Sequence, residues 1–113
     1  MNRILEQALL YDFYGELLTK HQKEVYEQFI LDDLSLSEIA ESAGISRQGV
    51  HDLIRRCNKI LQEYENKLHL IERFVKIREE VGSIQKLAEN PQISKEELIG
   101  KVNEISHRII EEL

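Results

Sequence analysis

A short window near the middle of the chain carries the side chains best suited to nucleic-acid chemistry. Residues 46–59 hold four Lys or Arg and one Asp, whereas residues 1–45 and 60–113 carry net charges of −6 and −3. Arg pairs bidentately with guanine and Gln with adenine, and helix-start N–H groups bind phosphate. The predicted nucleic-acid-binding residues are Ser46, Arg47, Gln48, His51, Asp52, Arg55, Arg56 and Lys59. The alternative is that the cations form surface ion pairs with nearby acids such as Asp52 and Glu63.

The residues around this window fit a helix-turn-helix. The stretch LSLSEIAESAGISRQGVHDLIR predicts a short helix, a tight turn and a second helix. A near-perpendicular helix pair needs a small contact residue, a turn glycine, an apolar plug and two inward apolar positions. These are Ala40, Gly44, Ile45, Val50 and Leu53. The N-terminal part of the second helix enters the major groove in this motif, so we predict a recognition helix at about residues 46–56.

Helices on both sides must hold this motif. Apolar residues at 3–4 spacing predict helices over about residues 2–18 and 20–31. A longer repeat runs from residue 47 to 89, with a break expected near 66–68, and Asn90-Pro91 ends it. A final helix follows. Ser or Thr three residues before Glu or Gln predicts capping boxes, which begin at Thr19, Ser35 and Ser94.

The predicted fold is therefore all-α without β-sheet. A helix-turn-helix domain is expected over residues 1–66. A C-terminal helical hairpin is expected over residues 67–113, and its apolar seams favour a homodimer.

Composition excludes several other classes of protein. The single cysteine, Cys57, cannot form an internal disulfide and lies on an apolar seam, so we expect it in the core. Because no apolar run approaches about 18 residues and the start lacks a signal peptide, we expect a cytoplasmic protein without membrane contact. His51 and His69 have no further ligand at metal spacing. Without a paired acid–base set, a phosphate-cradling glycine loop or an activated nucleophile, we expect neither metal, cofactor nor enzymatic activity.

Two nested resemblances rest on these same segments. The stretch LTKHQKEVYEQFILDDLSLSEIAESAGISRQGVHDLIRRCNKIL resembles region 4 of bacterial sigma factors, which reads the −35 promoter element. The whole chain resembles the YlxM-like family of small helix-turn-helix proteins of Gram-positive bacteria and relatives. This match is carried by LLYDFYGELLTKHQ, LDDLSLSEIAE, SRQGVHDLIRR and EYENKL.

The resemblance carries expectations about function. Members of the family are typically encoded beside the signal recognition particle GTPase, which implies a part in, or regulation of, that pathway. The family's DNA-reading helix falls on residues 46–56. Gly49 stands where Ala is common and His51 where an aromatic residue such as Tyr is common. Gly49 permits either close helix packing or close approach of a partner's backbone.

Two functions remain open from the sequence. The first is a DNA-binding regulator whose C-terminal helices form the dimer. The second is a protein- or RNA-interaction module that binds the particle's GTPase or its RNA without reading DNA. A net charge of −6 opposes binding to a polyanion, and it suits a basic protein partner.

Overall fold

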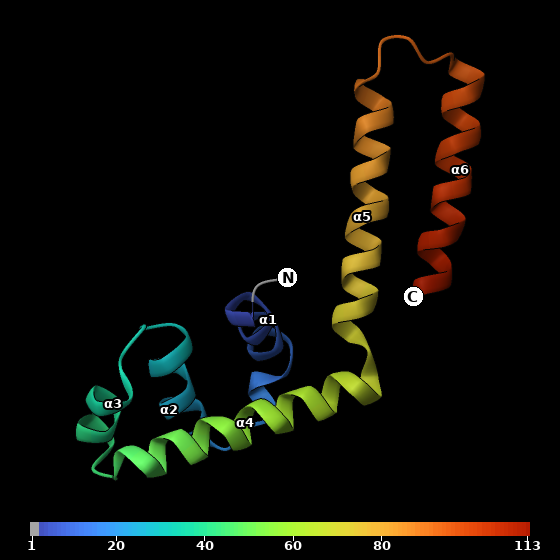
Figure 1. The fold of residues 1–113 in the computed structure, drawn as a ribbon. Helices are drawn as coiled ribbons and strands as arrows, with labels where there is room; N and C mark the ends of the chain where they lie inside the picture. Colours follow the sequence, from blue (N-terminus) through green and yellow to red (C-terminus); the bar gives the residue numbers. More distant parts are fainter. Residues whose placement is uncertain (1–2) are drawn as a thin grey trace. The chain divides into compact units, whose positions relative to one another are not determined.

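The computed structural model describes residues 3–113 as helices and short connections, with no strand in that range. The all-α prediction is therefore confirmed. In chain order the elements are α1 (Arg3–Tyr14), a 3-10 turn η1 (Gly15–Leu17), α2 (Lys20–Ile30), α3 (Leu36–Ala43), α4 (Arg47–Leu68), α5 (Leu70–Glu89) and α6 (Lys95–Glu112) (Figure 1). None of these helices is long and apolar enough to cross a membrane.

The chain divides into two compact units after His69. The boundary predicted after residue 66 falls inside α4, which continues to Leu68. His69 then takes a left-handed conformation with φ of 57°, and α5 begins at the next residue. Because a non-glycine residue rarely adopts this conformation, and no Gly or Pro stands here, the sequence carries little local signal for the position of the break.

In the first unit, α4 packs against α1, α2 and α3. The buried side chains come from all four helices and from the connection after η1; they are Leu10, Tyr11, Tyr14, Leu18, Val25, Tyr26, Ile39, Val50, Ile54, Cys57 and Leu61. Cys57 is fully buried, as predicted. Burial raises the pKa of its thiol to about 11, so the thiol stays neutral near neutral pH.

Tyrosine hydroxyls join the helices of this core. Tyr14 donates to Glu65 of α4 at 2.5 Å, and Tyr26 donates to Asn58 of α4. Tyr11 donates to Glu27 of α2. Each bond gives a partly buried hydroxyl an acceptor, so the rings pack in the core without leaving a polar group unsatisfied.

The first helix is shorter than predicted. Its expected start at Asn2 lies outside the described residues, and α1 ends at Tyr14 instead of continuing to Leu18. Gly15 follows, where an added Cβ would lie only 2.7 Å from the ring of Tyr11. The chain tightens into η1 at this point, so the apolar spacing through Leu17 did not mark the end of the helix.

The helix starts follow the predicted capping signals closely. Thr19 with Gln22 and Ser35 with Glu38 form complete capping boxes, which confirms two of the three predictions. Ser94 accepts the Glu97 N–H at 3.2 Å, but the reciprocal bond from the Ser94 backbone to Glu97 is absent among the bonds of residues 3–113. Helix α6 therefore begins with an N-cap alone.

The second unit is the hairpin of α5 and α6, which lie side by side and antiparallel (Figure 1). The Asn90 side chain accepts the Gln92 N–H at 2.9 Å in the turn that contains Pro91. Ion pairs join the helices, between Arg108 and Glu80 at 3.1 Å and between Lys76 and Glu112 at 3.8 Å. Ile105 is its one buried residue, and α5 contributes none.

Candidate nucleic-acid interface

The turn between α3 and α4 has the geometry of the predicted motif. Gly44 ends α3 with φ of 70°, and the N–H groups of Gly44 and Ile45 both donate to the Ala40 carbonyl, at 3.0 and 3.1 Å. A residue with a Cβ would be strained at this φ, which explains the turn glycine. The bonds reverse the chain directly before α4.

Packing between α3 and α4 depends on residues that only partly match the predicted set. Val50 is fully buried and Leu53 is half-buried, as an inner face requires. Ala40 is half-buried, whereas the neighbouring Ile39 is completely buried. Ile45, expected to plug the turn, keeps 37% of its surface exposed. The main apolar contact of α3 is therefore Ile39.

Ser46 caps the start of α4. Its backbone is extended, and its hydroxyl accepts the Gly49 N–H at 2.9 Å. A Cβ added at position 49 would lie 3.1 Å from this hydroxyl oxygen, which is tighter than ordinary van der Waals contact. Gly49 thus leaves room for the Ser46 cap. The sequence alone did not predict this contact.

Three of the predicted nucleic-acid-binding residues come together beside the start of α4. Arg47, Gln48 and His51 are exposed and line one open groove of about 440 Å³, together with Leu36 from α3. Within the groove, the Gln48 amide donates to the Asp52 carboxylate at 3.0 Å, and His51 Nδ1 lies 3.8 Å from the same carboxylate. Asp52 therefore orients a reading residue and adds a negative charge beside it.

Three cations of the predicted nucleic-acid-binding set, Arg55, Arg56 and Lys59, form a second groove one turn further along α4. Its lining consists of Asp52, Arg55, Arg56 and Lys59, and its volume is about 380 Å³. All four side chains are exposed. Across residues 3–113, no acidic side chain forms an ion pair with any of these three cations or with Arg47. The alternative interpretation, in which these cations form surface ion pairs with nearby acids, therefore does not describe the arrangement.

A cation outside the predicted set also lies beside this groove. Arg3, at the start of α1, shares a third hollow of about 290 Å³ with Lys59 of α4. The packing of α1 on α4 creates this proximity across more than fifty positions of sequence. In the sequence, Arg3 belongs to an acidic N-terminal segment, and its proximity to Lys59 depends on the packing of α1 against α4.

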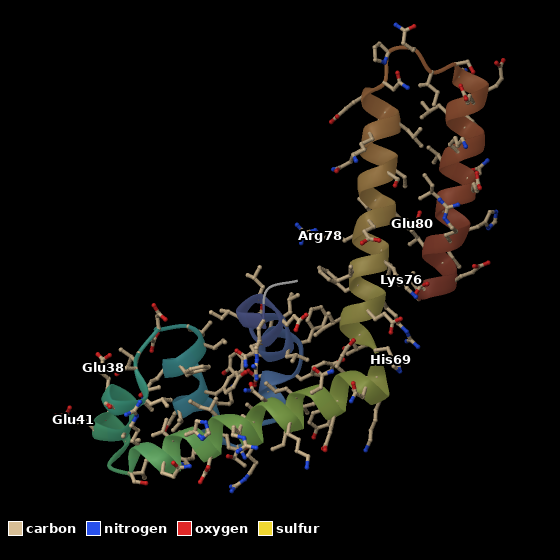
Figure 2. The ribbon with its side chains drawn as sticks, viewed as in Figure 1. Glu38, Glu41, His69, Lys76, Arg78 and Glu80 are labelled. Atoms are coloured by element: carbon tan, nitrogen blue, oxygen red, sulfur yellow. The ribbon has the colours of Figure 1, made fainter. Side chains whose placement is uncertain are left out.

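Acidic side chains lie close to the motif as well. Glu38 and Glu41 project outward from α3 (Figure 2). Glu38 accepts the Ser35 N–H at 3.0 Å, and this bond lowers the pKa of its carboxyl group, so the carboxyl group stays ionised. The first helix of the motif thus presents negative charge to solvent.

Cys57, His51 and His69 do not form a metal site in the described residues. Cys57 is buried, and His51 and His69 lie at opposite ends of α4. No group of three His, Cys, Asp or Glu side chains within residues 3–113 has the arrangement of a metal site.

Comparison with known proteins gives matches over most of the chain. The sequence model of the UPF0122 family, described as "Putative helix-turn-helix protein, YlxM / p13 like", matches residues 1–105. A UPF0122 protein of Thermoanaerobacter pseudethanolicus is 40% identical over 111 residues, which cover 90% of this chain and 95% of the relative. A UPF0122 protein of Staphylococcus epidermidis is 43% identical over 94 residues, which cover 83% and 86%. One from Symbiobacterium thermophilum is 51% identical over 71 residues, which cover 63% and 66%.

Proposed function

Because the chain belongs to the UPF0122 family of YlxM/p13-like helix-turn-helix proteins, we propose that it is a DNA-binding regulator. It is linked to the signal recognition particle pathway, the connection that the resemblance in sequence implies. It acts by binding alone, in the cytoplasm, without a catalytic step or a cofactor. One observation carries the proposal: three exposed reading side chains share a groove at a capped helix start, and unpaired cations follow directly.

The start of α4 enters the major groove in this proposal. Arg47 and Gln48 offer the hydrogen-bonding groups that read guanine and adenine edges. The Gly49 N–H is occupied by Ser46, which leaves the two preceding N–H groups of α4 for a phosphate oxygen. Arg55, Arg56 and Lys59 then neutralise phosphates along the adjoining strand, and this contribution weakens as salt rises.

A fluorescence-anisotropy titration tests this function. The labelled probe is duplex DNA from upstream of the protein's own operon, and unlabelled signal recognition particle RNA is the competitor. We expect saturable duplex binding with a steep salt dependence and weak competition by the RNA. Absence of duplex binding at low salt, or complete displacement by the RNA, would overturn the proposal.

The exposed carboxylates of α3 favour a second candidate. Glu38 and Glu41 repel phosphate, but they complement a basic protein surface. In this version the protein binds the signal recognition particle GTPase or its RNA, and the helix-turn-helix serves as a scaffold. A pull-down with purified GTPase, with and without the RNA, gives capture only under this second function.

Neutralising Asp52 is expected to tighten duplex binding about fivefold at low salt. Asp52→Asn retains an oxygen that accepts the Gln48 amide, and it removes the one negative charge between the two grooves. A like charge near phosphate costs roughly 1 kcal/mol at a solvated surface, which corresponds to this factor. Anisotropy titrations over a range of salt should show the gain shrinking as salt rises.

The matched control is Glu63→Gln, which changes the net charge equally at another exposed position of α4. Glu63 lines neither basic groove. An equal gain in affinity for both variants would mean that the total charge of the protein, and not the groove around Asp52, limits binding.

A further inference from the structure

A hollow between α1 and α4 gathers polar side chains that lie outside the helix-turn-helix turn. Its volume is about 290 Å³, and the buried Leu10 is its apolar lining residue. The polar lining residues are Arg3, Glu6, Gln7, Asn58, Lys59 and Gln62. Two cations and three amide side chains therefore share one small space on the surface of the first unit.

The hydrogen-bond donors of this hollow are available to a ligand. Arg3 and Lys59 are exposed, and neither forms an ion pair with an acidic side chain of residues 3–113. The side-chain oxygen of Asn58 accepts the hydroxyl of the fully buried Tyr26. This bond fixes the Asn58 side chain, and its amide nitrogen donates to no group of the described residues. Two cations beside a free amide donor suit an anionic oxygen.

The charge of the hollow matches a single negative charge. Glu6 is its one acidic lining residue, and it forms no ion pair with Arg3 within the described chain. Arg3 and Lys59 supply two positive charges against this one carboxylate, which leaves a net charge of +1. Each phosphodiester of a DNA strand carries one negative charge, so a phosphodiester fits both the donors and the charge.

The hollow continues the basic groove on α4. Lys59 lines both the hollow and the groove that contains Arg55 and Arg56. At about 100° per residue, Gln48, Lys59 and Gln62 fall within about 60° of one another around α4. The side chains proposed to read bases and those of the hollow therefore lie on the same side of this helix.

The position of the hollow along α4 suits the dimensions of duplex DNA. Lys59 follows His51 by eight residues, which is about 12 Å at a rise of about 1.5 Å per residue. The major groove is also about 12 Å wide. A helix whose start lies against the base edges therefore meets the bordering sugar–phosphate backbone at about Lys59, where Arg3 shares the hollow.

We propose that Arg3, Asn58 and Lys59 bind a phosphodiester of the DNA strand that borders the major groove. Contact with the duplex then extends from the helix-turn-helix onto α1. This inference rests on the proposed DNA-binding function and adds to it a site outside the motif. The site holds the backbone and reads no base, so it contributes affinity without sequence preference.

Arg3→Ala is expected to weaken duplex binding about fivefold at low salt, because one charge-assisted contact is lost. The slope of log affinity against log salt should fall in magnitude by about 0.9. Anisotropy titrations with duplex DNA from upstream of the protein's own operon measure both quantities. The same factor should be lost on duplexes of unrelated sequence, since the contact is made to the backbone. Arg3→Lys retains the charge and should recover most of the affinity.

Hydroxyl-radical footprinting locates the contact on the DNA. At saturating protein, Arg3→Ala should lose protection of a few backbone positions at one border of the bound segment, while protection inside the segment persists. If the hollow instead held a free phosphate ion, the footprints of Arg3→Ala and the wild type would be identical. Identical footprints would overturn the proposal.

Arg78→Ala is the matched control for the loss of one arginine. Arg78 is exposed on α5, is directed away from α6 (Figure 2) and forms no ion pair within the described residues. Its replacement should change affinity only slightly. Equal losses for Arg3→Ala and Arg78→Ala would reject the site, because binding would then follow total charge. A wild type that binds no duplex would reject the DNA-binding function itself, and with it this site.

Glu6→Gln tests the same hollow with a change of the opposite sign. It removes the one carboxylate of the lining, so duplex affinity should rise about threefold at low salt. A gain of affinity cannot come from a loss of folding, which keeps the test decisive if Arg3→Ala is less helical by circular dichroism. Glu63→Gln is again the control for net charge, because Glu63 does not line the hollow. Equal gains for the two glutamine variants would contradict the proposal.

Discussion

Replacing Arg55, Arg56 and Lys59 together by alanine is expected to weaken duplex DNA binding by at least about 100-fold at low salt. These three cations line one exposed groove, and no carboxylate among residues 3–113 is ion-paired with them, so their charge is available to phosphate. Three charge-assisted contacts at about 1 kcal/mol each account for this factor. The slope of log affinity against log salt should fall in magnitude by about 2.7 per protomer, at 0.9 per phosphate contact. Anisotropy titrations at several salt concentrations measure both quantities.

The control for this triple variant is a second one with the same change in net charge. Lys86, Lys95 and Lys101 are exposed in the second unit and form no ion pair within the described chain. Their replacement by alanine should lower affinity only slightly, since they lie outside the proposed interface. Similar losses in the two triple variants would show that binding follows total charge and not the groove on α4.

Truncating Ile39 to alanine should lower the free energy of unfolding by about 3 kcal/mol. Ile39 is fully buried, and it is the only buried residue of the eight-residue helix α3. Loss of a buried Ile side chain costs its transfer free energy and leaves a cavity, which together amount to about 2–5 kcal/mol. Because α3 supports the start of α4, duplex binding should weaken as well. Urea denaturation followed by circular dichroism gives the stability change.

Ile45→Ala removes the same atoms from the neighbouring turn. Its side chain is 37% exposed, so the expected loss is under about 1.5 kcal/mol. Equal destabilisation by the two substitutions would mean that Ile45 anchors the motif as strongly as Ile39. The packing described for α3 would then be wrong.

Local signals in the sequence were enough to predict the motif and several helix starts. Gly44 occupies a backbone conformation that favours glycine, and Ser35 and Thr19 cap the helices that they were expected to cap. Such features depend on residues within one turn of each other. Their hydrogen bonds therefore depend mainly on neighbouring residues, although the equally local pair of Ser94 and Glu97 forms only one of its two expected bonds.

Features that depend on packing between distant segments were harder to predict from the sequence. The hollow shared by Arg3 and Lys59 exists because α1 packs on α4. The complete burial of Ile39, relative to the half-buried Ala40, depends on how far α3 is rotated against α4. Helical periodicity identifies an apolar face, but it does not identify the residue at its centre.

The break after α4 was also only approximately predictable. His69 has a left-handed backbone that costs a non-glycine residue roughly 1–2 kcal/mol. A histidine at this position does not by itself predict a left-handed backbone. The apolar repeat continues through the break, so the sequence pattern resembles a single long helix.

The tyrosines that form these core hydrogen bonds also give the protein an intrinsic fluorescence signal. The chain has no tryptophan, and all four tyrosines lie between residues 11 and 64, within the first unit. Tyrosine fluorescence therefore monitors that unit alone, whereas the far-ultraviolet dichroism of the helices monitors both. Comparing the midpoints of the two signals in one denaturation experiment distinguishes a single cooperative transition from separate melting of the two units.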